Sequence, residues 1–206
     1  MALVKYNNNS ISAVTSAASI PSGAMTLIKT LTASSSSTLS FVDGSSDVVL
    51  DSTYPIYKFE FINMHPASNE VNFSVNFRDG GSSYDATKTT TAFASDHYEN
   101  DSGATLFYWG SKDLAQSTSA QPIASAIGND NDQSCSGSLL LFNPSSTTFV
   151  KHFISDVNVI HASDLSLRQL SAGYCNVTVA IDGVQFSMSS GNIDSGTIKL
   201  YGIKDS

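Results

Sequence analysis

The chain has 206 residues, enough for one ordinary domain with a substantial core. Only 14% of the residues are charged, and 10 Lys and Arg against 18 Asp and Glu give a formal net charge of −8 at pH 7. The sequence has no basic cluster to neutralise phosphates and no apolar stretch of membrane-spanning length, so we expect neither a nucleic-acid partner nor membrane insertion.

The first 24 residues, MALVKYNNNSISAVTSAASIPSGA, are small and polar, with only scattered Leu, Val and Ile. Such a segment cannot bury enough apolar area to offset its own ordering entropy. We therefore interpret residues 1–24 as an extended docking arm that becomes ordered against a partner, with a frayed terminus as the alternative. The stretch lacks the charged start and apolar run of a secretory signal, so we expect synthesis in a cytoplasm.

From residue 25 onward, apolar and polar residues alternate with a period of two, which is the pattern of half-buried β-strands. The clearest case is VNFSVNFR, in which Val71, Phe73, Val75 and Phe77 would face a core. The same pattern recurs along the chain and predicts about eleven strands. They span residues 25–32, 38–42, 56–62, 71–78, 89–94, 104–109, 138–142, 147–154, 173–181, 184–188 and 196–203.

Sequences rich in Gly, Asn, Asp and Pro separate these strands. Between two strand patterns, Asp182 and Gly183 predict a two-residue hairpin turn, because both tolerate positive φ. Helical patterns are short, with residues 111–122 the best candidate and 163–170 the second. Many short strands without βαβ spacing predict one all-β domain over residues 25–206, an antiparallel β-sandwich of jelly-roll or immunoglobulin-like type.

The loop GNDNDQSCSG at 128–137 raises the question of a metal site, because Asp130 and Asp132 lie one residue apart in it. An EF-hand counted from Asp130 needs Gly at position six and Glu at position twelve, where this sequence has Cys135 and Leu141. A calcium site built from the two carboxylates and backbone carbonyls is the alternative. A plain loop of turn-forming residues explains the stretch without a ligand, so we expect no metal ion and no other cofactor.

Patterns that carry catalysis are missing from the sequence. There is no GxSxG elbow, no HxxxH or CxxC spacing, and only three Glu residues among scattered Asp. We therefore expect that the protein is not an enzyme. For Cys135 and Cys175, which have no CxxC partner, packed thiols are the favoured interpretation and a disulfide is the alternative.

Aromatic, histidine and carboxylate side chains gather in DHYENDSGATLFYWG, residues 96–110. This mixture suits stacking on sugar rings while accepting their hydroxyl protons. The alternative is that Phe107 and Trp109 are inward positions of a strand and that Tyr98 caps the edge of the core. The candidate contacts to a ligand or host surface are Asp96, His97, Tyr98, Tyr108, Trp109, Asp130 and Asp132.

Five runs of the sequence have to be considered together: VKYNNNSI, IPSGAMTLIKTLTASSSSTLSF, YKFEFINMHPAS, IGNDNDQSCSGSLLLFNPSSTTFVKHF and VQFSMSSGNIDSGTIKLYGI. As a set they resemble structural proteins of tailed phages that infect marine bacteria, of the cyanophage and pelagiphage type. The resemblance covers nearly the whole chain, although each run contains only strand and turn sequence. It brings no catalytic residues with it.

The resemblance implies a non-enzymatic virion protein, made in the host cytoplasm. We expect an exposed component of a tail fibre or related appendage, with a decoration (cement) protein of the capsid head as the alternative. The arm would bind other virion proteins, and the distal loops would contact a host-surface glycan. Apolar residues at outward strand positions, such as Ile62, Tyr201 and Ile203, would be buried in a homo-oligomer, for which we expect a homotrimer.

Overall fold

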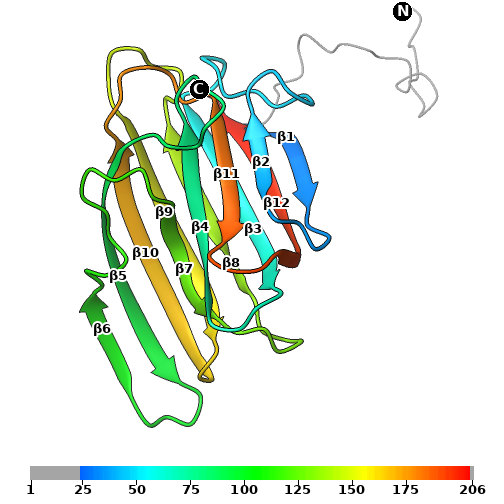
Figure 1. Ribbon diagram of the computed structural model, residues 1–206, viewed down its shortest axis with the longest axis vertical. Helices are drawn as coiled ribbons and strands as arrows, with labels where there is room; N and C mark the ends of the chain where they lie inside the picture. The colour runs from blue at the N-terminus through cyan, green and yellow to red at the C-terminus, as the bar shows by residue number, and fades with distance from the viewer. Residues whose placement is uncertain (1–23, 205–206) are drawn as a thin grey trace, which may run out of the picture.

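The computed structural model describes residues 24–204. Within this range the chain forms twelve β-strands and no helix, and all paired strands are antiparallel (Figure 1). The all-β antiparallel prediction is confirmed, while the predicted arm lies outside the described residues except for Ala24. The strands are β1 (Met25–Thr32), β2 (Leu39–Val42), β3 (Ile56–Pro66), β4 (Val71–Arg78), β5 (Lys88–Tyr98), β6 (Ala104–Tyr108), β7 (Gln121–Ile127), β8 (Cys135–Phe142), β9 (Lys151–His161), β10 (Leu165–Cys175), β11 (Gly183–Met188) and β12 (Ile193–Ile203).

The strands pair into two series. One runs β1-β12-β3-β8-β9-β10-β5-β6 and the other β2-β11-β4-β7, with the bridge Ile127↔His161 joining β7 to β9. Eight of the strands, β1-β12-β3-β8 and β2-β11-β4-β7, follow the double Greek-key order of a jelly roll. The hairpin β5–β6 is inserted in the chain between β4 and β7, and the hairpin β9–β10 between β8 and β11. Both hairpins add their strands to the first series, beyond β8.

Aromatic rings join the two series in a shared core. The ring centroid of Phe186 on β11 lies 5.4 Å from that of Phe59, 5.2 Å from that of Phe61 and 5.7 Å from that of Phe73. Pairs at this spacing stabilise a core beyond the area they bury. The four inward positions predicted on β4 are all buried, as the period-two alternation requires.

The two ends of the strands differ in what they carry. At one end, called the terminal end here, the described chain begins and finishes, and the N–H of Lys204 donates to the carbonyl of Ala24 at 3.0 Å. The opposite end, called the loop end, is tied together between loops, since Asn129 N donates to Asn69 Oδ1 at 3.2 Å. The loop end comprises residues 33–38, 67–70, 99–103, 128–134, 162–164 and 189–192.

Both predicted helices are wrong. Residues 163–170 enter β10, where Leu165 and Leu167 are buried while Ser166 and Arg168 are exposed, so the period is two and not 3.6. Residues 111–120 form an irregular loop, and Gln121 at the start of β7 holds it, because its Nε2 donates to the carbonyl of Lys112 at 2.8 Å. The loop leads into β7, a strand missed in the sequence because QPIASAI holds a proline and small residues.

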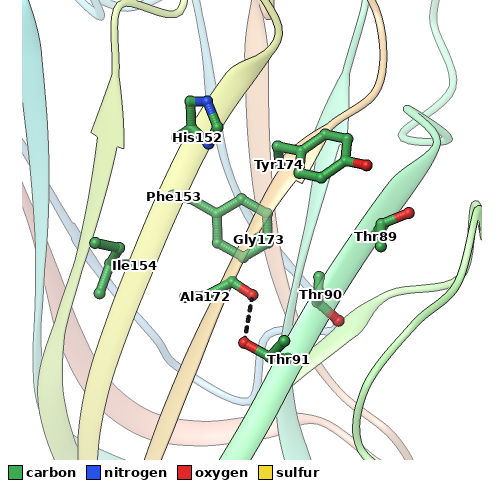
Figure 2. Close-up of a pocket in the computed structure, with 9 residues that line it drawn as sticks. All are labelled: Thr89, Thr90, Thr91, His152, Phe153, Ile154, Ala172, Gly173 and Tyr174. Carbon is green, nitrogen blue, oxygen red and sulfur yellow. Dashed lines mark hydrogen bonds between the residues drawn. The ribbon is translucent and has the colours of Figure 1, made fainter.

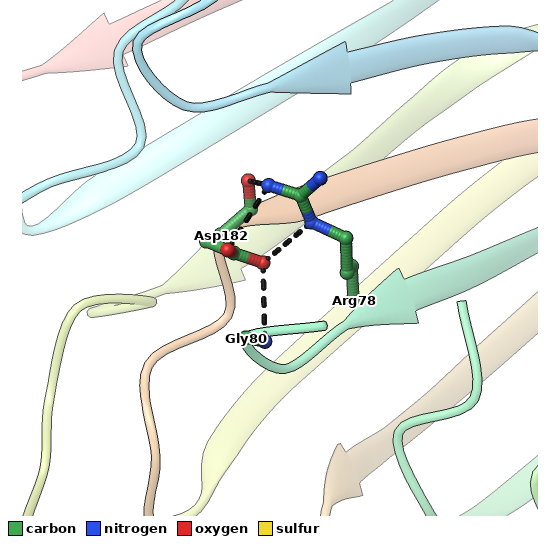
Figure 3. A network of polar contacts seen from close by, with 3 residues as sticks. All are labelled: Arg78, Gly80 and Asp182. Atoms are coloured by element: carbon green, nitrogen blue, oxygen red, sulfur yellow. Dashed lines mark hydrogen bonds and ion pairs between the residues drawn. The ribbon is translucent and has the colours of Figure 1, made fainter. Parts of the chain in front are cut away.

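The strand predicted over residues 173–181 ends at Cys175. The next residues leave the sheet because the buried ammonium of Lys151 binds their carbonyls, including that of Val177 at 3.0 Å. The hairpin turn predicted at Asp182 and Gly183 is therefore wrong as well. The Asp182 carboxylate instead accepts from Arg78 Nε at 2.8 Å and Nη2 at 3.0 Å and from Gly80 N at 3.3 Å, joining the start of β11 to the end of β4 (Figure 3).

Candidate functional site

The aromatic candidates on β5 and β6 do not form one cluster. In the antiparallel register Ala104 lies opposite His97, at the loop end, while Tyr108 lies opposite Phe93, further back along the hairpin. These two residue pairs are four residues apart along the strand, which is roughly 13 Å at the usual rise per residue. His97 and Tyr98 therefore cannot share one sugar ring with Tyr108.

Trp109 is an inward position, as the structural alternative predicted. Its ring packs against Phe107 with centroids 5.3 Å apart, and both side chains lie against the core. Lys112 Nζ lies 5.3 Å from the centre of the Trp109 ring, a cation–π contact. Tyr108 points to the other face of the hairpin and donates its hydroxyl proton to Asp113. Trp109 is thus a structural residue, and Tyr108 belongs to the outer sheet face.

The remaining residues of this stretch lie at the loop end. Asp96 accepts hydrogen bonds from the N–H of Thr105 at 2.9 Å and from its hydroxyl at 2.8 Å, so the carboxylate fixes the hairpin. His97 Nε2 lies 3.0 Å from Asp101 Oδ1 on an exposed surface, where such a pair contributes little to stability. His97 and the partly exposed ring of Tyr98 remain available to an external partner.

Loop 128–134 folds around a residue that the sequence analysis missed. The side chain of Gln133 is buried, and its Oε1 accepts from the N–H of Asp130 at 3.1 Å. The Gln133 N–H in turn donates to the carbonyl of Asp130 at 2.8 Å. A Cβ atom at Gly128 would lie 1.7 Å from Gln133 Oε1, so only glycine leaves room for this arrangement. The loop holds the side chains of Asp130 and Asp132 in solvent.

A polar pocket of about 550 Å³ lies beside this loop. It includes Asp132 but not Asp130, and the bulged strand β3 and the start of β12 supply the rest of its lining. His65 Nδ1 lies 2.6 Å from the carbonyl of Gln133, which ties β3 to the loop. Carboxylates, amides and hydroxyls of this kind bind hydroxyl-rich ligands by hydrogen bonds. The lining residues are Asn63, His65, Asn131, Asp132, Gln133, Ser134, Asp194 and Ser195.

A second, apolar pocket of about 410 Å³ lies on the outer face of β5, β9 and β10 (Figure 2). Ala172 lies between Ile154 on β9 and Thr91 on β5, and its small side chain leaves the hollow. His152 and Tyr174 close one side, with ring centroids 6.0 Å apart. The pocket has no carboxylate or lysine in its lining, and its polar groups are the His152 ring and the tyrosine and threonine hydroxyls, so it offers mainly shape and apolar contact.

Three titratable groups with shifted pKa values lie together inside the terminal end. Lys88, Cys175 and Lys151 are cross-strand neighbours on β5, β10 and β9, and all three are buried. Burial lowers the pKa of Lys88 to about 8, lowers the pKa of Lys151, and raises the pKa of Cys175 to about 12. Lys88 Nζ donates to Asn76 Oδ1 at 2.5 Å and to the carbonyl of Ala86 at 2.8 Å. A substrate cannot reach these groups, so their role is structural.

Over residues 24–204, no three His, Cys, Asp or Glu side chains gather into a group that could hold a metal ion. In the same range the chain forms no helix long and apolar enough to cross a membrane. No protein-family model, no curated protein and no solved structure matches the chain. The polar pocket and the exposed loops around it are thus the candidate site, on geometry alone.

Proposed function

We propose that this protein is a non-enzymatic structural component of a phage virion, exposed on a tail fibre or related appendage, whose loop end contacts the host surface. The observation that carries the proposal is the division of the fold into two ends. The described chain begins and finishes at the terminal end, and the polar pocket with its surrounding loops lies at the other. A domain anchored through its N-terminus would present those loops outward.

The chemistry of the loop end supports a weak, polar contact. Asp132 and Asp194 supply acceptors and Asn63 and Asn131 supply both donors and acceptors around one pocket. His97 and Tyr98 lie at the same end of the sheet, on the β5–β6 hairpin, which β9 and β10 separate from β8. Such contacts gain strength through copy number, because many copies on one particle convert weak binding into avidity.

The virion assignment is tested by fractionation of particles from a lysate of infected cells. We expect the chain to band with intact particles in a density gradient and to resist a salt wash. Recovery of the chain in the particle-free fraction alone would refute the assignment. Quantitative stoichiometry of the same particles separates a fibre, with few copies, from a decoration protein of the head, with many.

The host-contact role is tested separately with the recombinant protein on host cells. Asp132→Ala removes one charged acceptor from the polar pocket, and we expect cell binding to fall about tenfold. The matched control is Asp85→Ala, which changes the charge equally on an exposed loop at the terminal end. Equal binding by both variants and the unchanged protein would exclude the polar pocket as the contact.

A further inference from the structure

The series of eight strands ends in two edge strands, and they differ in how well they are protected. At one edge, β1 carries Lys29 and a register shift between Leu27 and Lys29, both of which discourage another strand from pairing. At the other edge, β6 pairs with β5 in an unbroken register. Its sequence, ATLFY, contains no charge, no proline and no glycine. Strand β6 therefore lacks the devices that normally block an edge.

The backbone geometry shows which groups of β6 are unpaired. Tyr98 N donates to the carbonyl of Gly103 at 3.0 Å, and Trp109 N donates to the carbonyl of Ala92 at 2.8 Å. In an antiparallel ladder the hydrogen-bonding groups of alternate residues face the same neighbour. The odd-numbered residues of β6 therefore face β5, and the N–H and C=O groups of Ala104, Leu106 and Tyr108 face away from it.

Within residues 24–204 no strand takes up these outward groups, because β6 pairs with β5 alone. Figure 1 draws β6 at the margin of the sheet, with no labelled strand on its open side. The side chains beside the open edge are apolar: Leu106 is 76% exposed, Tyr108 59% and Phe93 43%. Phe93 lies opposite both Tyr108 and Leu170, so an apolar row runs inward from the edge on the outer face.

We propose that β6 pairs antiparallel with β6 of a second copy of this chain, about a two-fold axis through Leu106. In that register Leu106 faces its own counterpart, and Tyr108 faces Ala104, a large residue against a small one. Three residue pairs with two hydrogen bonds each satisfy the outward groups of both copies, six bonds in all. No other register centred on this strand uses every outward group.

A second copy fits this edge better than an unrelated strand does. The pairing is closed: β6 of one copy pairs with β6 of the other about a two-fold axis, so neither β6 is left open to a third chain. The pairing also brings no like charges together within the two β6 strands, because β6 itself has no charged residue, although each chain has a net charge of −8. The proposal does not depend on the virion role. The homotrimer expected from the sequence remains a separate prediction.

Sedimentation velocity over a roughly hundredfold concentration range tests the pairing, at an ionic strength of about 0.15 M that screens the net charge. We expect a monomer–dimer equilibrium that Leu106→Lys weakens at least about tenfold, since a lysine on an edge strand opposes pairing. The matched control is Leu27→Lys, which places the same charge on the other edge strand at a residue 51% exposed. We expect the control to dimerise like the unchanged protein.

A cross-link tests the register itself. Residues that form a hydrogen-bonded antiparallel pair have Cα atoms about 5.5 Å apart, within disulfide range. We therefore expect Leu106→Cys to form a covalent dimer under mild oxidation and Leu27→Cys to form none, while the two native thiols stay buried. A chain that stays monomeric, an oligomer equally sensitive to both lysine variants, or a trimer that Leu106→Lys leaves intact would each overturn the proposal.

Discussion

Replacing Lys88 by Met should stabilise the protein at neutral pH, and by an amount that depends on pH. The ammonium of Lys88 is fully buried, with Asn76 and the carbonyl of Ala86 as its hydrogen-bond partners. Burial lowers its pKa from 10.5 to about 8. A difference of roughly 2.5 pKa units corresponds to about 3 kcal/mol of destabilisation whenever the folded protein holds the charged form.

The direction of the pH dependence follows from proton counting. Below about pH 8 the lysine is protonated in both the folded and the unfolded chain, so the whole penalty is present. Between pH 8 and 10.5 the unfolded chain binds more protons than the folded one, and the free energy of unfolding rises with pH. Lys88→Met has no such group. We therefore expect the unchanged protein to gain about 3 kcal/mol relative to the variant across this window.

Urea denaturation followed by the fluorescence of Trp109, the single tryptophan, measures this difference at a series of pH values. Other titrating groups are common to both proteins and cancel in the comparison, and the Cys175 thiol, with its pKa near 12, stays protonated. Lys199→Met, on the outer face of β12, is the control for loss of a positive charge at a partly exposed position. A stability difference between Lys88→Met and the unchanged protein that stays flat from pH 8 to 10.5 would refute the reasoning.

Three further outcomes are expected. Phe186→Ala should lower the free energy of unfolding by about 4 kcal/mol, because it removes the ring that contacts four others in the core, and chemical denaturation measures the loss. Gly128→Ala should expel the Gln133 side chain and open loop 128–134 to limited proteolysis; an unchanged cleavage rate would contradict the proposed packing. Cys135 and Cys175 should react with a thiol reagent only after denaturation, since burial raises the pKa of each.

The alternation of apolar and polar side chains predicts well which face of a strand is buried, but it predicts poorly which strands lie beside each other. Val71 and Phe73 are buried as predicted, because a strand repeats every two residues whatever lies beside it. Alternation does not identify the element where the spacing of apolar residues fits both a strand and a helix. Leu165 and Leu167 have the spacing of a strand, while Leu167 and Leu170 have that of a helix. Only the pairing of β10 with β5 and β9 shows that the segment is a strand. Strand order depends on contacts between distant segments, which periodicity does not encode.

The candidate site was only partly predictable for the same reason. Asp132 lies in the polar pocket, but His65 and Asp194 reach it from β3 and β12, far away in the sequence. The predicted contacts Asp96, His97 and Tyr98 and those on loop 128–134 do lie at one end of the sheet. Tyr108 and Trp109 are the exceptions, because both lie further back along the β5–β6 hairpin. The role of Gln133 had no signal in the sequence apart from the neighbouring Gly128.

The place of β12 between β1 and β3 has a consequence for synthesis of the chain. A ribosome makes β1 long before β12, so β1 has no partner among the described strands until β12 has also been made. Pairings this distant fold slowly and leave strand edges uncovered meanwhile. A nonsense mutation shortly before Ile193 would leave every other strand in the released product, yet that product would lack the strand that joins β1 to β3.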